Sequence, residues 1–285
     1  MLFPSPIASA SLAFMLVSLS APAAAQSMNR IDQRAWIQLG AARAHVDSSL
    51  RADYVGDPAL GLPPLSTTLD FEDDLKLDRS HTVPNIVLGV RLFERWRVEF
   101  ETYRLRRTAT QTLLDEAVTI DGTTYSASAR LNSEFMSRVQ RLTLGYSLLK
   151  TPSAELGVAL GVQYTRYRLR LEGVGQVDNG PPEVRSAEEG DKGPLPTVGL
   201  YGSFALGSAW SAAGRVDYLP VESRRVNGYL GSVEANVYHR LSPNWTVGVG
   251  YRYIEYRVDR KATGDVGGRF EYRFRGPQVL LEAGF

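Results

Sequence analysis

The chain has 285 residues, and its 32 Lys and Arg against 31 Asp and Glu leave a formal net charge of +1. This balance argues against a nucleic-acid-binding protein, which usually carries a basic excess or a basic face. Cysteine is absent, which excludes disulfides, thiolate metal sites and a lipid anchor attached to cysteine. Downstream of residue 26 there is no long apolar run, so a protein that crosses a membrane with helices is not expected.

Residues 1–25 are typical of a secretory signal peptide. An apolar core runs from Ile7 to Leu19, and Ala23-Ala24-Ala25 before Gln26 forms a small-residue cleavage site. The segment before the core lacks Lys and Arg, so only the amino terminus supplies positive charge there. An N-terminal membrane anchor is the alternative, but the apolar core is too short to span a bilayer. We therefore expect residues 26–285 to form the mature protein.

Period-two alternation of apolar with small or polar residues predicts ten strands in the mature chain. In chain order they are centred on residues 36–46, 86–92, 96–102, 142–148, 156–164, 198–206, 210–218, 233–237, 245–253 and 269–285. The alternation is clearest after the turn at Ser242-Pro243-Asn244, where Trp245 and Tyr253 bracket an aliphatic middle. In the last strand the apolar parity switches around Gly276-Pro277, which predicts a β-bulge.

The connections between these strands alternate in length. Short turns are predicted near residues 94–95, 150–153, 207–209 and 242–244, and long loops at about 47–79, 108–133 and 173–196, with a shorter one at 220–228. Short turns on one side and longer loops on the other are typical of a transmembrane antiparallel up-and-down β-barrel. The predicted fold is therefore all-β, with eight or twelve strands as alternatives to ten and with both termini on the periplasmic side.

All four tryptophans, Trp36, Trp96, Trp210 and Trp245, open strands that are predicted to start from the periplasmic side. Tryptophan favours the interface between lipid and water. This shared position predicts a periplasmic aromatic belt, whereas four ordinary core tryptophans would be scattered along the strands.

The signal peptide, the alternating strands and the terminal aromatic Phe285 together resemble small proteobacterial outer-membrane β-barrel proteins. Val279, Leu281 and Ala283 loosely match the alternate hydrophobic positions of that class's assembly signal. The segment from Phe71 to Asp78, followed by Pro84, also looks like a recurring segment of uncharacterised barrels. The resemblance implies a location in the outer membrane, with outer-membrane lipid, lipopolysaccharide and the barrel-assembly machinery as partners and Phe285 as the assembly signal. It implies no particular activity.

Charged residues occupy the parity that faces the barrel interior. The set has five cationic and six anionic members: Arg91, Arg97, Glu99, Glu101, Arg141, Glu155, Arg215, Asp217, Glu234, Arg252 and Glu282. A ten-stranded barrel is narrow, and mixed charges in a poorly hydrated space must pair to offset their desolvation. We therefore expect a charge-filled lumen in a protein of structural or interaction type. A narrow channel for small solutes or ions is the alternative, although a selective pore would favour one sign of charge.

The chain contains three histidines, which are the candidates for a general base in catalysis. His239 lies at the periplasmic end with parity toward lipid, while His45 and His81 lie near Asp47 and the acidic run that contains Asp73 and Asp74. Barrel proteases of the omptin type use Asp–His and Asp–Asp pairs, but the spacing here does not match that motif. A rim hydrolase, either an omptin-like protease or a lipid A-modifying enzyme, is thus a second alternative. We predict no catalytic, cofactor-binding or metal-binding residues, and the acidic run lacks the ligand spacing of a calcium loop.

Arginines also cluster near the external strand ends. Guanidinium groups bind phosphate in a bidentate manner, which suits the phosphates of lipopolysaccharide. A solvated, locally paired loop base is the alternative interpretation. The residues concerned are Arg104, Arg106, Arg107, Arg166, Arg168 and Arg170.

Overall fold

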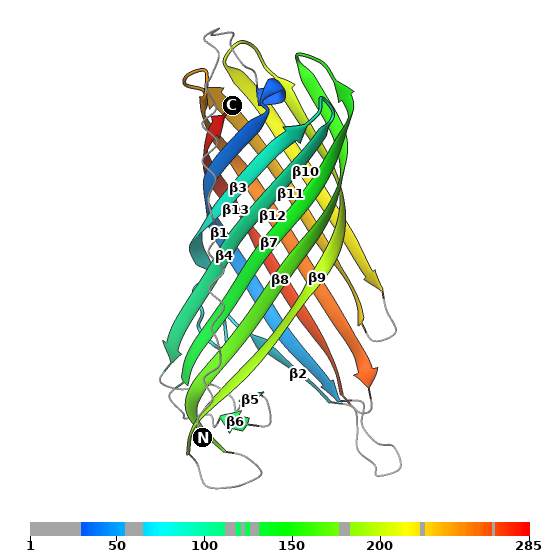
Figure 1. Ribbon diagram of the computed structural model, residues 1–285. Helices are drawn as coiled ribbons and strands as arrows, with labels where there is room; N and C mark the ends of the chain where they lie inside the picture. The colour runs from blue at the N-terminus through cyan, green and yellow to red at the C-terminus, as the bar shows by residue number, and fades with distance from the viewer. Residues whose placement is uncertain are drawn as a thin grey trace, which may run out of the picture.

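The computed structural model describes residues 30–54, 65–111, 118–120, 123–125, 131–176, 183–222, 226–263 and 266–285. The predicted signal peptide, residues 1–25, lies outside them. The described residues form a closed antiparallel 10-strand barrel (Figure 1). Its strands are β1 (Ala35–Tyr54), β3 (Ser80–Leu92), β4 (Trp96–Gln111), β7 (Leu131–Lys150), β8 (Ala154–Gln176), β9 (Glu183–Ala205), β10 (Trp210–Glu222), β11 (Val226–Arg240), β12 (Trp245–Thr263) and β13 (Val266–Gly284). The prediction of ten strands in up-and-down order is confirmed.

Three short strands and one turn of helix are added to the barrel. They are β2 (Leu65–Asp70), β5 (Val118–Ile120), β6 (Thr123–Tyr125) and the 3-10 helix η1 (Arg30–Asp32). β2 pairs with the far end of β1, and β6 pairs with β5 and β8. The barrel closes because β1 pairs with both β3 and β13, as shown by Trp36 opposite Gly89 on one side and Gly284 on the other.

The barrel has two unlike ends. Four tight turns, η1 and Phe285 lie together at one end, which is uppermost in Figure 1 and is called the short-turn end. The opposite ends of the barrel strands form the other end of the barrel, called the long-hairpin end. Tight turns at one end and long hairpins at the other match the architecture of transmembrane barrels. The loop predicted at 220–228 is wrong for most of its length, because β10 continues to Glu222 and β11 begins at Val226.

The outer wall next to the short-turn end is apolar. Side chains that alternate along the barrel strands are largely exposed there, which is the pattern expected of a wall in contact with lipid. This apolar band includes Ile37, Leu39, Ile86, Leu88, Leu142, Leu144, Leu160, Val162, Val198, Leu200, Val216, Val233, Val249 and Val279. The described residues contain no helix that is long and apolar enough to cross a membrane.

The strands extend far beyond the apolar band, so the predicted loop at 173–196 is wrong as secondary structure. β8 and β9 stay paired as far as Gly175 opposite Glu183, and their ladder includes Pro194 and Pro196. The Gly, Pro and Glu content of this stretch suggested a loop, but cross-strand backbone pairing holds it in a long hairpin. In the loop predicted at 108–133, β4 continues to Gln111, and residues 112–117, 121–122 and 126–130 lie outside the described part.

The predicted bulge at Gly276-Pro277 is also wrong. β12 and β13 pair through Tyr251–Pro277 and Arg252–Gly276 without a shift in register. Even-numbered β13 residues face inward throughout, so that Phe274 is as buried as Gln278. The apolar pattern switches because the barrel interior changes from polar near the short turns to aromatic farther along, while the strand itself continues unchanged.

The aromatic part of the interior is completed by an inward segment, Phe71–Leu77, which sequence analysis assigned to a polar external loop. Phe71, Leu75 and Leu77 are only 1%, 0% and 2% exposed. The acidic residues shape the turn, since the Asp70 carboxylate accepts the backbone N–H groups of Glu72 and Asp73 at 2.9 and 2.8 Å. The apolar side chains pack against Ala42, Ala44, Val46, Val83, Tyr103, Leu105, Phe135, Val139, Leu169, Ile254, Tyr272 and Phe274.

Candidate functional site

The charged side chains of the interior gather in one layer near the short-turn end, called here the ionic layer. It contains all eleven residues assigned to the lumen from sequence, contributed by β3, β4, β7, β8, β10, β11, β12 and β13. Arg30 of η1 joins them, so that six arginines face six carboxylates. The inward parity of the strands places these residues on the same side of the barrel wall.

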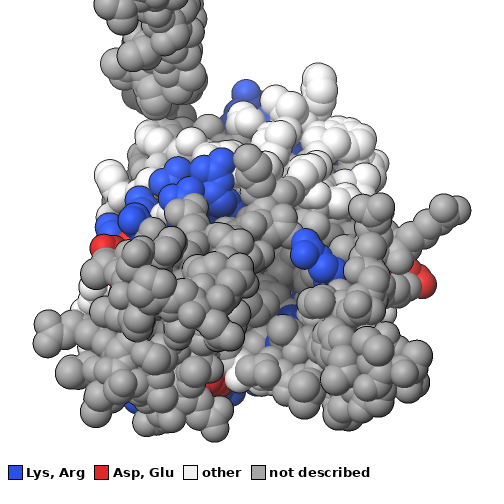
Figure 2. Space-filling view, turned by 90° about the horizontal axis from the view of Figure 1, so that it is seen from below, with Lys and Arg blue, Asp and Glu red and all other residues white. Residues whose placement is uncertain are grey.

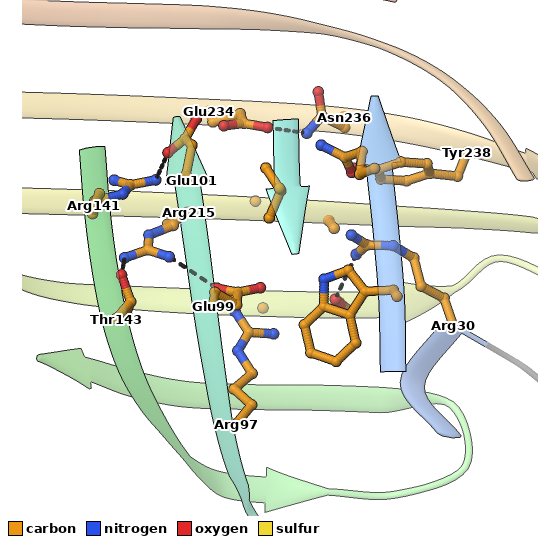
Figure 3. A pocket seen from close by; sticks show the side chains of 17 residues that line it. Arg30, Arg97, Glu99, Glu101, Arg141, Thr143, Arg215, Glu234, Asn236 and Tyr238 are labelled. Atoms are coloured by element: carbon orange, nitrogen blue, oxygen red, sulfur yellow. Dashed lines mark hydrogen bonds and ion pairs between the residues drawn. The ribbon is translucent and has the colours of Figure 1, made fainter. Parts of the chain in front are cut away.

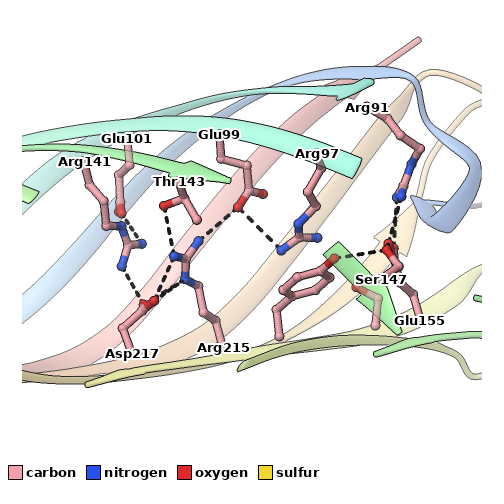
Figure 4. Close-up of polar contacts among 12 residues, drawn as sticks. Arg91, Arg97, Glu99, Glu101, Arg141, Thr143, Ser147, Glu155, Arg215 and Asp217 are labelled. Atoms are coloured by element: carbon pink, nitrogen blue, oxygen red, sulfur yellow. Dashed lines mark hydrogen bonds and ion pairs between the residues drawn. The ribbon is translucent and has the colours of Figure 1, made fainter. Parts of the chain in front are cut away.

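One ion pair of this layer lies beside the short turns. Arg91 binds Glu155 through two parallel hydrogen bonds of 2.8 and 2.9 Å (Figure 4). Ser147 donates a further hydrogen bond to Glu155, and its oxygen lies 3.0 Å from the Tyr201 hydroxyl. Arg97 stacks on the Tyr201 ring, with its guanidinium carbon 3.4 Å from the ring centroid. Bidentate and stacked contacts of this kind fix a guanidinium in one orientation.

A second group connects four strands deeper in the barrel. Arg215 donates two hydrogen bonds of 2.8 Å and one of 3.0 Å to Asp217, and it reaches Glu99 at 3.0 Å. Arg141 bridges Asp217, at 2.6 Å, to Glu101. Glu101 also accepts Arg252 at 2.6 Å. Each cation therefore contacts at least one carboxylate, which offsets the cost of removing both groups from water.

Arg30 is a site residue that sequence reasoning missed. Its guanidinium donates to both oxygens of Glu282 at 3.0 and 3.1 Å and lies 4.3 Å from the centroid of the Tyr238 ring. Arg30 precedes the first strand, so alternation could not place it inside the barrel. The one available signal was charge, because five interior arginines left one of six carboxylates without a counterpart.

Glu234 is held differently from the other carboxylates. It accepts hydrogen bonds from the side-chain amides of Asn236, at 2.7 Å, and Gln278, at 3.0 Å. Within the part of the chain that the structure describes, no arginine lies within ion-pair distance of it. Both amides donate to the same carboxylate oxygen, Oε1, in place of a cation.

A small cavity of about 70 Å³ remains within the ionic layer. Figure 3 looks into it, with Arg30 and Tyr238 on one side and Arg215 and Glu99 on the other. Its volume suits a few water molecules.

A separate ion pair is buried inside that apolar core. Arg107, only 1% exposed, pairs with Glu72 of the inward segment and donates a 2.6 Å hydrogen bond to Ser48. Glu72 accepts the Ser48 backbone N–H at 2.8 Å and its hydroxyl at 2.7 Å. The expectation that Arg107 meets lipopolysaccharide phosphates is therefore wrong, because inward parity on β4 places this side chain inside the barrel.

The aromatic belt needs one correction. Trp36 is 7% exposed and lies inside the barrel, where its ring occupies the space that a Cβ atom on Gly89 would take. Trp96, Trp210 and Trp245 are 41%, 51% and 49% exposed on the outer wall beside the short turns. Trp36 differs because even-numbered residues of β1 face inward.

Phe285 lies at the seam that closes the barrel. Its backbone N–H donates to the Ala35 carbonyl at 2.8 Å, and its own carbonyl accepts from Arg34 at 2.7 Å and Ala35 at 3.0 Å. Its ring is 50% exposed on the outer wall. The terminal residue thus joins the first and last strands.

Three of the residues considered for catalysis, His45, Asp47 and Asp73, lie in one group that is joined through Arg79. His45 Nε2 lies 3.5 Å from the Asp47 carboxylate, which Arg79 and Arg275 also approach at 3.3 and 3.6 Å. Asp73 pairs with Arg79, and Asp74 accepts the backbone N–H of Asp70 at 2.7 Å. His81 and His239 make no contact with this group. General-base catalysis requires hydrogen-bond reach between the partners, about 2.6–3.2 Å, and the 3.5 Å between His45 and Asp47 lies just beyond it.

Comparisons with known proteins agree with this architecture. The outer-membrane protease OmpT from Escherichia coli superposes with a TM-score of 0.55 at 14% identity, covering 88% of this chain and 97% of its own. The chain has the outer-membrane β-barrel fold. The toluene transporter TodX of Pseudomonas putida, with a TM-score of 0.38, 7% identity and coverage of 88% and 90%, is more distant. The translocator domain of the autotransporter NalP from Neisseria meningitidis superposes with a TM-score of 0.46 at 8% identity, covering 88% of each chain.

No family model and no curated protein matches the chain. At these identities the comparisons establish the barrel fold alone.

Proposed function

We propose that this barrel is an integral outer-membrane protein of structural or interaction type whose interior is closed to solutes. In this proposal residues 1–25 direct export, and the apolar band of the outer wall crosses the outer membrane. Outer-membrane barrels usually have short turns in the periplasm and longer loops outside the cell. We therefore assign the short-turn end to the periplasm and the long-hairpin end to the exterior.

One observation carries the proposal, namely that two different kinds of packing fill the barrel in series. The ionic layer occupies the interior near the short turns, and the inward segment with its aromatic partners occupies it farther along. A conducting pore needs a continuous polar path. The balance of charge in the ionic layer also gives no preference for cations or anions.

The hydrolase alternative has less support. Asp47 is contacted by two arginines besides His45, which suits an ion-paired surface better than a general base. The omptin-like protease and the lipid A-modifying enzyme therefore remain alternatives that no specific contact favours, and we propose no catalytic role.

Planar bilayer recording tests the proposal. We expect the mature protein to insert without unitary current steps, while a general porin in the same bilayers conducts. Flotation with vesicles and resistance of the barrel to protease establish that the protein has inserted. Reproducible steps of one size, from inserted protein, would contradict the closed barrel and support the channel.

A further inference from the structure

Three arginines form a row across the outer wall of the barrel. Arg138 of β7 lies directly opposite Arg104 of β4 on one side and Arg166 of β8 on the other. β4, β7 and β8 are neighbours in the wall that faces the viewer in Figure 1. Arg104 and Arg138 are exposed and Arg166 is partly exposed, and all three have the outward parity of their strands.

Such a row is unfavourable by itself. Side chains directly opposite each other on adjacent strands lie about 5 Å apart at Cβ, and like charges in this position destabilise a sheet. No described carboxylate forms an ion pair with any of the three. Glu134 lies on the same wall, farther toward the long-hairpin end, but it pairs with Arg106 at 3.1 Å and not with an arginine of the row.

The opposite part of the outer wall is built differently. On β12 and β13, Arg273 pairs with Glu255 at 3.3 Å, and Arg257 lies 3.4 Å from Glu271. Beyond the apolar band, arginines on β12 and β13 thus have carboxylate partners, whereas Arg104, Arg138 and Arg166 on β4, β7 and β8 lie beside one another. Seen from the long-hairpin end, the largest group of basic side chains lies on one side, at the upper left of Figure 2, with smaller groups elsewhere.

The height of the row on the wall indicates what meets it. Phe100, Leu142 and Val162 form a paired row of the apolar band, and the arginine row lies four residues farther along the same strands. At ~3.3 Å per residue this is roughly 13 Å along the tilted strands. The row between them is Thr102, Gln140 and Tyr164, so the aliphatic side chains end before the arginines begin. This is the level expected for lipid head groups beside a membrane-spanning barrel.

We propose that Arg104, Arg138 and Arg166 bind the phosphate groups of a glycolipid that carries two or more phosphates, with its acyl chains on the apolar rows of β4, β7 and β8. Guanidinium groups bind phosphate in a bidentate manner, and several phosphates in one molecule supply the counter-charge that the row lacks. This inference needs the barrel to reside in a membrane, but it does not depend on whether the interior conducts.

Binding of fluorescent bisphosphorylated lipid A to the refolded mature protein, in a detergent without phosphate, tests the proposal. The variant Arg104→Gln/Arg138→Gln/Arg166→Gln is expected to bind at least tenfold more weakly than the wild type. The matched control is Arg257→Gln/Arg269→Gln/Arg273→Gln, which removes three arginines that have carboxylate partners. Its affinity should stay within about twofold of the wild type. Equal losses in both variants, or none in the first, would overturn the proposal.

A single variant separates lipid binding from a structural role. Arg138→Gln removes the centre of the row, so without lipid A its unfolding temperature should equal or exceed that of the wild type. Addition of lipid A should then stabilise the wild type more than the variant. Destabilisation of Arg138→Gln without lipid would contradict the proposal, as would equal stabilisation of both by lipid A.

The source of the phosphate is decided by competition. Dephosphorylated lipid A should bind at least tenfold more weakly, and inorganic phosphate at equal phosphate concentration should leave bound lipid A in place. Displacement by inorganic phosphate would overturn the assignment to lipid. Vesicle insertion and bilayer recording of the same variants report on the proposed function independently.

Discussion

Replacing Glu101 by glutamine is expected to lower the free energy of unfolding by about 3–5 kcal/mol, the usual cost of breaking a buried ion pair from one side. Glu101 is 4% exposed and accepts from both Arg141 and Arg252. Arg141 retains Asp217 in the variant, but Arg252 has no other described carboxylate within ion-pair distance. The loss of stability therefore arises mainly from Arg252, a buried cation that can neither reach water nor lose its proton.

Urea unfolding of the refolded barrel, followed by tryptophan fluorescence, measures this change. Glu134→Gln is the matched control, since Glu134 pairs with Arg106 on the outer wall, where the arginine side chain is 56% exposed. That variant should lose no more than about 1 kcal/mol. Similar losses of unfolding free energy in the two variants would contradict the prediction that a buried ion pair of the ionic layer costs more to break than an exposed pair.

Replacing Arg107 by methionine is expected to lower the free energy of unfolding by a similar amount, about 3–5 kcal/mol, because it leaves a buried carboxylate without its cation. It leaves the Glu72 carboxylate in the apolar core with only the Ser48 backbone N–H and hydroxyl as partners. Because Glu72 belongs to the inward segment, we also expect the variant to expose this segment to protease before the barrel unfolds. Urea unfolding and limited proteolysis measure the two effects.

A double variant identifies the origin of that loss. Replacing the pair together, as Glu72→Leu/Arg107→Met, removes both charges and substitutes apolar groups of similar size. Exchanges of this kind are often neutral or stabilising. The double variant should therefore be more stable than Arg107→Met alone, and a greater loss in the double variant would contradict the account of an uncompensated carboxylate.

The wall of the barrel could be predicted from sequence because lipid imposes a strict rule on it. Alternate residues such as Val247 and Val249 must be apolar, so ten strands and their order follow from period two. Interior charges could be assigned for the same reason. Near the short turns the two faces of each strand differ in polarity, and parity alone separates them.

Parity cannot assign the faces of a strand where the lipid-facing and the interior-facing side chains are both apolar or aromatic. Tyr272 and Phe274 face the interior, yet in sequence they look like lipid-facing residues, and this produced the false bulge at Gly276-Pro277. Trp36 was misplaced for the same reason. An aromatic residue at a strand end is compatible with either face, and only the register of β1 against Gly89 decides between them.

Interior contacts made from outside the strands could not be predicted. The inward segment is acidic and follows a Pro-rich stretch, which made it look like a solvated loop. Asp70 and Asp74 instead accept backbone N–H groups of the turn. Glu72 and the apolar residues of the segment enter the barrel. Arg30 enters from the other end. No periodicity marks either residue set, because their positions depend on how the chain folds back over the rim.

Thiol accessibility reports directly on whether the interior of the barrel is packed, because the chain contains no cysteine of its own. Ser137 and Ala44 face the interior and are 1% and 0% exposed, whereas Ser153 is exposed in a short turn. We expect Ser137→Cys and Ala44→Cys to react with a membrane-impermeant maleimide only after unfolding in urea, while Ser153→Cys reacts at once. Reaction of Ser137→Cys in the folded barrel, at the rate of Ser153→Cys, would show an open lumen and contradict the account.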